Sequence, residues 1–146
     1  MVKPTIYIIN GPNLNLLGRR QPDIYGDTSF DDYLLDLRAN FDSIDIHYYQ
    51  SNHEGDLIDK LHAIGFKKNL GVILNAGAYT HTSIALGDAV ASIDAPIVEV
   101  HISDIAKREN FRHHSFIQSH AVHFIKGKGL AGYQEGINYL LEHELT

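Results

Sequence analysis

Short apolar segments alternate along the chain with stretches that have helical periodicity. Five of the apolar runs are rich in β-branched residues and have the length and composition of strands. These runs are residues 5–10, 44–49, 71–75, 96–102 and 121–125. The hydrophobic pattern therefore predicts five strands, each followed by a loop or a helix.

The segments between these strands predict amphipathic helices. After Ser29, apolar residues recur on one helical stripe that includes Leu34 and Leu37, and Ser29 with Asp32 forms a capping-box-like start. Further helices are predicted at residues 55–65, 83–94 and 133–145. This alternation, with no internal repeat and no low-complexity linker, predicts an α/β fold. We expect a five-stranded parallel sheet in flavodoxin-like order, with helices on both faces.

Length and composition fit one globular domain. The 146 residues are enough for a single core, so residues 1–146 are expected to form one domain. No apolar run approaches the roughly 20 residues that span a bilayer, and the N-terminus lacks the features of a secretory signal. A cytoplasmic location is the resulting expectation. The absence of cysteine excludes disulfides and thiolate metal sites.

The charge balance restricts the kinds of partner. A net charge of -6 and a pI near 5.9 argue against nucleic acid, because binding phosphates needs a basic face. An anionic ligand would need a local cluster of positive charge. Arg19 and Arg20 form such a pair in the loop after the first strand, close in sequence to Asn13 and Tyr25.

Polar side chains follow three of the predicted strands. Ligands of open α/β sheets bind outside the carboxyl ends of the strands, where these residues would meet. Glu99 and His101 share one side of the fourth strand because side chains alternate with a period of two, which favours a paired, oriented histidine. A surface-exposed edge pair is the alternative. The candidates at the strand ends are Asn13, Arg19, Arg20 and Tyr25; Asn75 and His81; and Glu99, His101 and Ser103.

Three other motifs have both a functional and a purely structural interpretation. Arg112 could bind a carboxylate or a diol through two hydrogen bonds, or lie in a solvated turn. His120 and His123 have opposite strand parity, so no metal site is expected. The GxGxxG pattern at residues 127–132 suggests a dinucleotide site, but too few residues follow it for another strand. A tight turn from strand to helix is the better interpretation.

Five segments together resemble type II 3-dehydroquinate dehydratase. They are "GPNLNLLGRRQPDIYG", "SNHEGDLIDKLH", "ILNAGAYTHTSIALGDA", "PIVEVHISDI" and "RENFRHHS", within a match from about Ile6 to His143. The resemblance implies a flavodoxin-like subunit and a homo-oligomer, a dodecamer built as a tetramer of trimers. It also implies dehydration of 3-dehydroquinate to 3-dehydroshikimate without cofactor or metal. Such a reaction serves the shikimate pathway of aromatic amino acid biosynthesis, or quinate breakdown.

The resemblance also implies roles for five catalytic residues. Tyr25 is similar to the general base that removes a proton from the carbon beside the ketone, and Arg20 matches an essential arginine on a mobile lid. His101 corresponds to the general acid that protonates the departing hydroxyl, and Glu99 holds its ring. Asn13 resembles the residue that positions a water against the enolate oxygen.

Six further residues match the family's substrate-binding positions. Three of them would contact hydroxyl groups of the substrate, two would hold its carboxylate, and one would reach into a neighbouring subunit's site. In that order they are Asn75, His81 and Arg112; Ile102 and Ser103; and Asp88.

Two features depart from the family's pattern. Residues 117–129 carry two histidines and two lysines where a more neutral, proline-containing run is expected, which bears on assembly contacts. Asp104 stands where the family often has asparagine, and its negative charge would oppose a bound carboxylate.

A tyrosine base explains why arginines gather beside Tyr25. With an ordinary pKa of about 10, a tyrosine is ionised about one part in a thousand at pH 7, so a resting phenolate needs roughly 4 kcal/mol. One guanidinium near 4 Å offers interaction of that order at an effective dielectric of about 20. A lysine Schiff base is the competing route, but none of the seven lysines is among the residues that match the family's site positions.

Two other classes of function compete with a dehydratase. A small-ligand binding module would use the same strand ends and arginines, but it would not need a tyrosine base and a histidine acid together. A nucleotide-binding oxidoreductase, based on residues 127–132, would retain a cofactor on purification.

Overall fold

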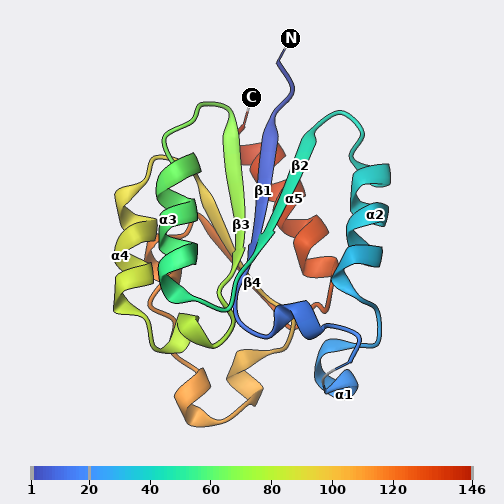
Figure 1. Cartoon of the computed structure of the whole chain (residues 1–146), viewed down its shortest axis with the longest axis vertical. Helices are drawn as coiled ribbons and strands as arrows, with labels where there is room; N and C mark the ends of the chain where they lie inside the picture. The colour runs from blue at the N-terminus through green and yellow to red at the C-terminus, as the bar shows by residue number, and fades with distance from the viewer. Residues whose placement is uncertain (1, 20, 146) are drawn as a thin grey trace.

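A parallel five-stranded sheet lies at the centre of the molecule (Figure 1). The computed structural model describes residues 2–19 and 21–145. The strand order is β2-β1-β3-β4-β5, and every neighbouring pair is parallel. The strands are β1 (Thr5–Asn10), β2 (Asp45–Gln50), β3 (Leu70–Asn75), β4 (Ile97–His101) and β5 (His123–Lys126).

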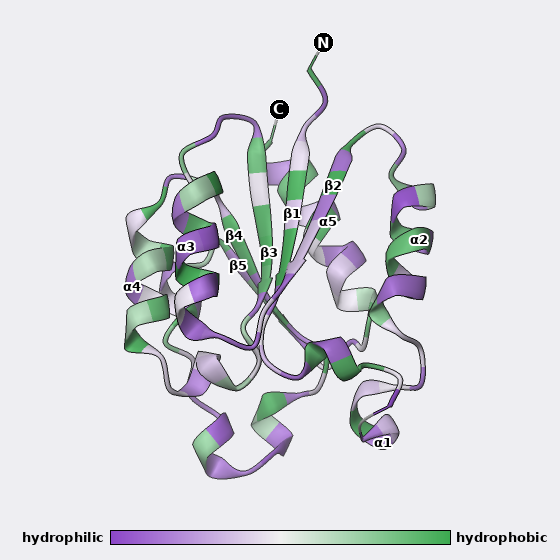
Figure 2. Ribbon diagram, viewed as in Figure 1, coloured by the Kyte–Doolittle hydropathy of each residue, from purple (hydrophilic) through white to green (hydrophobic). Residues whose placement is uncertain are grey.

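Helices cover both faces of the sheet. One face packs against α2 (Phe30–Asn40) and α5 (Ala131–His143), and the other against α3 (Glu54–Ile64) and α4 (Ile84–Ser92). Each face has its own buried cluster of aliphatic side chains, and the central strand β3 between them is largely hydrophobic in Figure 2. The predicted fold, a flavodoxin-like five-stranded α/β sheet with helices on both faces, is confirmed.

Local sequence signals explain where two helices begin and how closely a third packs. The Ser29 hydroxyl accepts from the Asp32 N–H at 3.2 Å, and the Ser83 hydroxyl accepts from the Leu86 N–H at 2.8 Å. A Cβ at Gly136 would lie 2.8 Å from the Ile73 side chain. Glycine therefore lets α5 lie directly against the sheet.

The observed elements differ from the predicted ones mainly at their ends. The last strand is residues 123–126 rather than 121–125, and the last helix is 131–143 rather than 133–145. A single helical turn, α1 (Pro22–Tyr25), was not predicted, because four residues are too few to show helical periodicity. None of the helices formed by the described residues has the length and hydropathy that crossing a membrane requires.

Two glycines of the GxGxxG pattern at residues 127–132 lie in the turn between β5 and α5. Gly127 and Gly129 have φ of 72° and 61°, which a side chain would oppose. Their N–H groups donate to the carbonyls of Ser103 and Ile102 at 3.1 Å each. The turn therefore supports the loop after β4.

Three polar side chains of residues 117–129, those of His123, Lys126 and Lys128, have partners within the chain. The His123 ring stacks on Tyr139, with centroids 4.2 Å apart, and His143 packs on the same tyrosine. The Lys126 ammonium lies 3.2 Å from an Asp104 carboxylate oxygen, and Lys128 lies 3.5 Å from Glu135. These contacts account for several of the charged and ring side chains that distinguish this segment from the family's pattern.

Candidate active site

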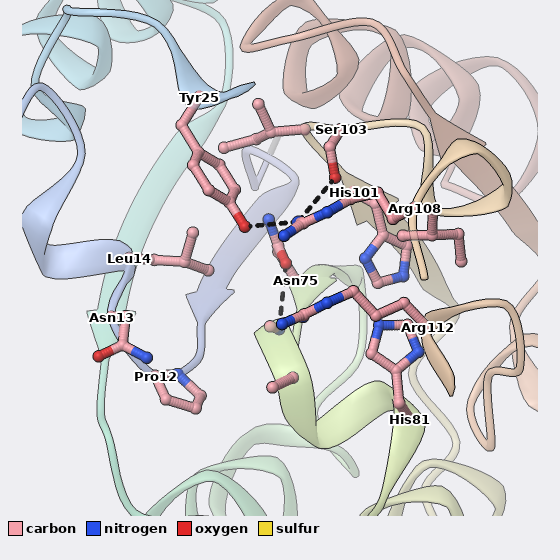
Figure 3. A pocket seen from close by; sticks show the side chains of 14 residues that line it. Pro12, Asn13, Leu14, Tyr25, Asn75, His81, His101, Ser103, Arg108 and Arg112 are labelled. Atoms are coloured by element: carbon pink, nitrogen blue, oxygen red, sulfur yellow. Dashed lines mark hydrogen bonds between the residues drawn. The ribbon is translucent and has the colours of Figure 1, made fainter. Parts of the chain in front are cut away.

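A pocket opens at the carboxyl ends of β1, β3 and β4 (Figure 3). The strand register brings these ends together, because Asn10 pairs with Asn75 and Leu74 pairs with Glu99. Fourteen residues line the pocket: Pro12, Asn13, Leu14, Tyr25, Asn75, Gly77, Ala78, His81, His101, Ile102, Ser103, Ile105, Arg108 and Arg112. The lining includes eight of the eleven site residues expected from the sequence.

The segment after β1 forms one wall of the pocket. Leu14 and Leu17 are buried in the core and anchor it. Between the strand and these anchors, Asn13 has a left-handed backbone with φ of 69°, and its N–H donates to the Asn52 side-chain oxygen at 2.9 Å. The Asn13 side chain is exposed at the rim of the pocket.

Tyr25 faces an arginine that was not among the expected site residues. The Arg108 Nη1 donates to the Tyr25 hydroxyl at 2.9 Å, and the Arg108 guanidinium carbon lies 5.8 Å from the centre of the Tyr25 ring. The same Nη1 lies 3.4 Å from the Ser103 hydroxyl. The Arg108 side chain is 14% exposed, so its positive charge is partly shielded from solvent beside the phenol. Its presence in "RENFRHHS", four residues before Arg112, was the available signal.

The arginine pair of the loop takes no described part in the pocket. Arg19 is exposed and is not among the lining residues. Arg20, expected to be the essential loop arginine, lies outside the described residues.

The His101 ring is oriented by a hydrogen bond to the buried Glu99 carboxylate. Their side chains are 4% and 0% exposed, and the His101 Nε2 lies 2.5 Å from the Glu99 Oε2. The period-of-two argument therefore gave the correct pairing, and the alternative of an exposed edge pair is excluded. Because Nε2 is directed at Glu99, Nδ1 is the ring nitrogen available to the pocket.

Asn75 is oriented by a buried tyrosine. Its Nδ2 donates to the Tyr133 hydroxyl at 2.9 Å, and its Oδ1 accepts from the Gly77 N–H at 3.1 Å. Tyr133 in turn donates to the Asn10 side-chain oxygen at 2.8 Å. Burial raises the pKa of the Tyr133 hydroxyl, which therefore stays protonated as a hydrogen-bond donor.

His81 is positioned as a neutral hydrogen-bond acceptor. Its Nδ1 lies 2.8 Å from the His114 carbonyl, and a carbonyl can only accept, so Nδ1 carries the proton. Burial lowers the pKa of the His81 ring below its usual value, an effect that the His114 hydrogen bond partly opposes. At neutral pH the remaining nitrogen, Nε2, is therefore an acceptor at a pocket-lining residue.

Arg112 lies in the pocket rather than in a solvated turn. Its side chain is 26% exposed, extends into the pocket in Figure 3, and has its Nε 3.0 Å from a Glu109 carboxylate oxygen. That contact is the main reason why the pKa of Glu109 is lowered. A guanidinium held in this way retains its other N–H donors for a ligand.

The loop after β4 contributes backbone and hydroxyl groups to the pocket. Ile102 and Ser103 both line it, and Asp104 follows on the side turned toward β5. The hydrogen bond from Lys126 is the main reason why the pKa of Asp104 is lowered. The negative charge expected to oppose a bound carboxylate therefore has a positive partner 3.2 Å away.

Asp88 is the expected site residue that lies apart. It is exposed on α4 and lines a separate shallow groove with Ile84, Ser115 and Phe116. It is not among the residues that line the pocket.

The pocket lining supplies arginine and histidine side chains, but no lysine is among its fourteen residues. Within residues 2–19 and 21–145, no three His, Asp or Glu side chains converge in a way that could hold a metal ion. The polar groups that face the pocket are thus a phenol, two guanidinium groups, two imidazoles, amides and a hydroxyl.

Comparisons with known proteins identify the family of this chain. A family model described as dehydroquinase class II matches residues 4–141. A protein of Exiguobacterium sp. named 3-dehydroquinate dehydratase is 51% identical over 140 residues, covering 94% of each chain. A catabolic 3-dehydroquinase of Pyricularia oryzae is 46% identical over 142 residues, covering 94% of this chain and 90% of the other.

The fold comparison gives the same family. The crystal structure of a type II dehydroquinase from Butyrivibrio crossotus superposes with a TM-score of 0.91 at 42% sequence identity. The superposition covers 95% of this chain and 98% of the other.

Proposed function

The chain belongs to the class II dehydroquinase family and is a type II 3-dehydroquinate dehydratase, and from this premise we propose how its pocket performs the reaction. Water is removed from 3-dehydroquinate by anti elimination through an enolate to give 3-dehydroshikimate. Tyr25, as a tyrosinate, is the base and His101 is the acid. The observation that carries this proposal is that two pairs, Arg108 with Tyr25 and Glu99 with His101, meet at one pocket.

The first step forms the enolate. The Tyr25 oxygen takes a proton from the carbon beside the ketone, and the electron pair of the broken C–H bond moves onto the carbonyl oxygen. The Arg108 guanidinium, 2.9 Å from the phenol oxygen, favours the phenolate by its charge and its hydrogen bond. Arg20 is proposed as a second positive group on the family's pattern. A water held by Asn13 would donate to the enolate oxygen.

The second step expels the hydroxyl group. The enolate electron pair returns to form the carbon–carbon double bond, the carbon–oxygen bond breaks, and the leaving oxygen takes a proton from His101 Nδ1 to become water. For this step the ring must carry a proton on each nitrogen, and the Glu99 carboxylate beside Nε2 is the negative partner of that cation. After turnover the proton gained by Tyr25 and the one lost by His101 are exchanged with solvent.

The remaining polar groups are proposed to hold the substrate. Its carboxylate would lie against the Ile102 and Ser103 main-chain and hydroxyl groups. Asn75 and Arg112 would donate to its ring hydroxyls, and the neutral His81 would accept from one of them. Such contacts fix the ring so that base and acid act on opposite sides of the breaking bonds.

Neither a cofactor nor an imine enters this mechanism. An imine would need a lysine amine in contact with the substrate ketone, and the pocket lining has none. We propose that residues 1–146 act as a single catalytic domain whose chemistry needs only protein side chains.

Assembly is proposed to complete the site. On the family's pattern the subunits form a dodecamer, a tetramer of trimers, and Asp88 reaches into a neighbouring subunit's pocket. The exposure of Asp88 and of the adjacent Ile84, which is 62% exposed, supports such a contact. Light scattering that showed a fully active monomer would contradict this role of Asp88.

The test is the growth of ultraviolet absorbance from the conjugated enone when chelator-treated protein meets 3-dehydroquinate. The assay is repeated after borohydride treatment in the presence of substrate, which would trap an imine. We expect turnover to survive both treatments. Loss of turnover after chelation or borohydride would overturn the mechanism, and folded protein that binds but does not convert the substrate would be a binding module on this scaffold.

A further inference from the structure

The Glu99 carboxylate receives more hydrogen bonds than its pairing with His101 requires. Glu99 is fully buried, and two hydroxyl groups contact it besides the imidazole. The Thr80 hydroxyl donates to Oε2 at 2.6 Å, and the Ser115 hydroxyl lies 2.9 and 2.8 Å from Oε1 and Oε2. Three donors around one carboxylate satisfy most of its acceptor positions, which a buried carboxylate needs.

The proton of the Ser115 hydroxyl has a defined direction. Its oxygen accepts from the N–H groups of Ile117 and Gln118 at 3.1 Å each, so the oxygen lone pairs are used on that side. The proton is left to point toward Glu99 and the Thr80 oxygen, which lies 3.0 Å away. Thr80 and Ser115 therefore form one hydroxyl pair that is directed at the carboxylate.

The two segments that carry these hydroxyls are fastened to each other. The Phe116 N–H donates to the Thr80 carbonyl at 2.9 Å, and the neighbouring His81 ring donates to the His114 carbonyl at 2.8 Å. Thr80 is fully buried, and neither Thr80 nor Ser115 lines the pocket. Their hydroxyls thus reach the site only through Glu99.

We propose that Thr80 and Ser115 are positioning residues for the acid step. Their hydroxyls fix the plane of the Glu99 carboxylate so that Oε2 faces the His101 Nε2, which keeps Nδ1 aimed at the leaving hydroxyl. This inference rests on the proposed function, because it assigns the hydroxyl pair to the expulsion of water and not to formation of the enolate. A group that helps only in the transition state changes kcat more than KM.

Thr80→Val is the variant that tests the pair, because valine has nearly the shape of threonine without the hydroxyl. Losing a hydrogen bond to a charged group should lower kcat about tenfold or more, while KM stays within about twofold. Thr80→Ser restores a hydroxyl at the same position and should restore most of kcat. Ser115→Ala is the second variant, in case valine at position 80 disturbs folding, and it should show the same split between kcat and KM.

A second readout separates positioning from a general loss of structure. In D₂O, a variant impaired only in water expulsion should form the enolate and return it, so NMR should show more exchange of the substrate's acidic C–H per dehydration than in the wild-type enzyme. An unchanged kcat in Thr80→Val and Ser115→Ala would overturn the inference while wild-type turnover stood. So would a loss that Thr80→Ser fails to rescue, or a loss without increased exchange. A wild-type protein without turnover would instead overturn the proposed function, and this inference with it.

Discussion

His101 and Tyr25 line the same pocket, but the chain holds the two side chains in different ways. His101 ends a strand that is buried along its whole length, and its partner Glu99 is contacted by two further hydroxyls. Tyr25 ends a single helical turn that buries none of its residues. Its hydroxyl accepts from Arg108, which lies 83 residues further along the chain.

One side chain thus lies in the buried core, and the other lies on a short turn at the surface. The proposed acid, His101, is buried with its partner Glu99, so a change there should disturb packing as well as chemistry. The proposed base, Tyr25, lies on a segment whose backbone turns at Gly18 and Gly26, both with positive φ. Variants on the base side should therefore alter rate with little effect on stability, whereas variants on the acid side should alter both.

Tyr25→Phe is the sharpest test on the base side. Removing the base should lower kcat by about 10²–10⁴-fold, with the melting temperature within about 2 °C because no packing is lost. Steady-state kinetics and calorimetry measure the two effects. Tyr139→Phe, on α5 outside the pocket lining, where the hydroxyl donates to the Val122 carbonyl, is the matched control and should leave kcat unchanged. A Tyr25→Phe enzyme with most of its activity would remove the base from the proposal.

Glu99→Gln is the corresponding change on the acid side. The new amide N–H groups would face the His101 ring and two hydroxyls, all of which donate to Glu99. We therefore expect kcat to fall about 100-fold. The free energy of unfolding should fall by about 3 kcal/mol. Urea denaturation measures the second effect. Glu135→Gln, at an exposed carboxylate 3.5 Å from Lys128, is the control and should change neither quantity. A Glu99→Gln protein as stable as the wild type would contradict the contrast between the two sides.

Arg108→Gln tests whether the arginine acts through the tyrosine. We expect kcat to fall by about 10–100-fold, as a charge-assisted hydrogen bond to the phenolate is lost. In the Tyr25→Phe background the same change should add little, because both substitutions remove one interaction. Fully additive losses in kcat would mean that Arg108 supports the reaction by another route, such as its contact with Ser103.

Protonation of His81 should make the KM for the substrate depend on pH. Burial holds the pKa of the His81 ring below its usual 6.5, so the ring is neutral at pH 7 and gains a proton only on further acidification. That proton would occupy the accepting Nε2, so KM should rise as pH falls through this lowered pKa and stay flat above it. The free energy of unfolding should also fall as the pH drops from 6.5 toward this lowered pKa, since the unfolded state binds the proton more readily.

His81→Gln is the variant that checks this assignment. It should raise KM by about 3–10-fold at pH 7, since one hydrogen bond to the substrate is weakened, and it should remove this part of the acid-side rise in KM. A variant that kept the full rise would show that another group causes it.

The smallest expected effect concerns Asp104 and Lys126. Lys126→Met removes the positive partner of a carboxylate beside the proposed carboxylate-binding loop, so KM should rise by about 2–3-fold at low salt. Adding Asp104→Asn to that variant should restore KM. If the double variant were no better than Lys126→Met alone, the charge of Asp104 would have no influence on substrate binding.

The sequence predicted the features that depend on local pattern. Apolar runs and helical stripes gave the strands and the main helices, and a period of two placed Glu99 and His101 on one side of β4. The rule that ligands bind at the carboxyl ends of strands then predicted most of the residues that line the pocket.

Contacts between distant segments could not be predicted in this way. Arg108 meets Tyr25 only because two loops pack together, and Ser115 reaches Glu99 because the loop after β4 folds back onto Thr80. The pairing of Asp104 with Lys126 depends on the register between β4 and β5. Each of these contacts is set by tertiary packing, which leaves no periodic signal in the sequence.

The proposed roles of Tyr25 as the base and His101 as the acid are tested most directly by proton exchange in D₂O. NMR would follow the acidic C–H of 3-dehydroquinate in the presence of His101→Ala and of Tyr25→Phe. We predict that His101→Ala exchanges this proton while dehydrating little, and that Tyr25→Phe does neither. Exchange catalysed by Tyr25→Phe, or none catalysed by His101→Ala, would contradict the assignment of base and acid.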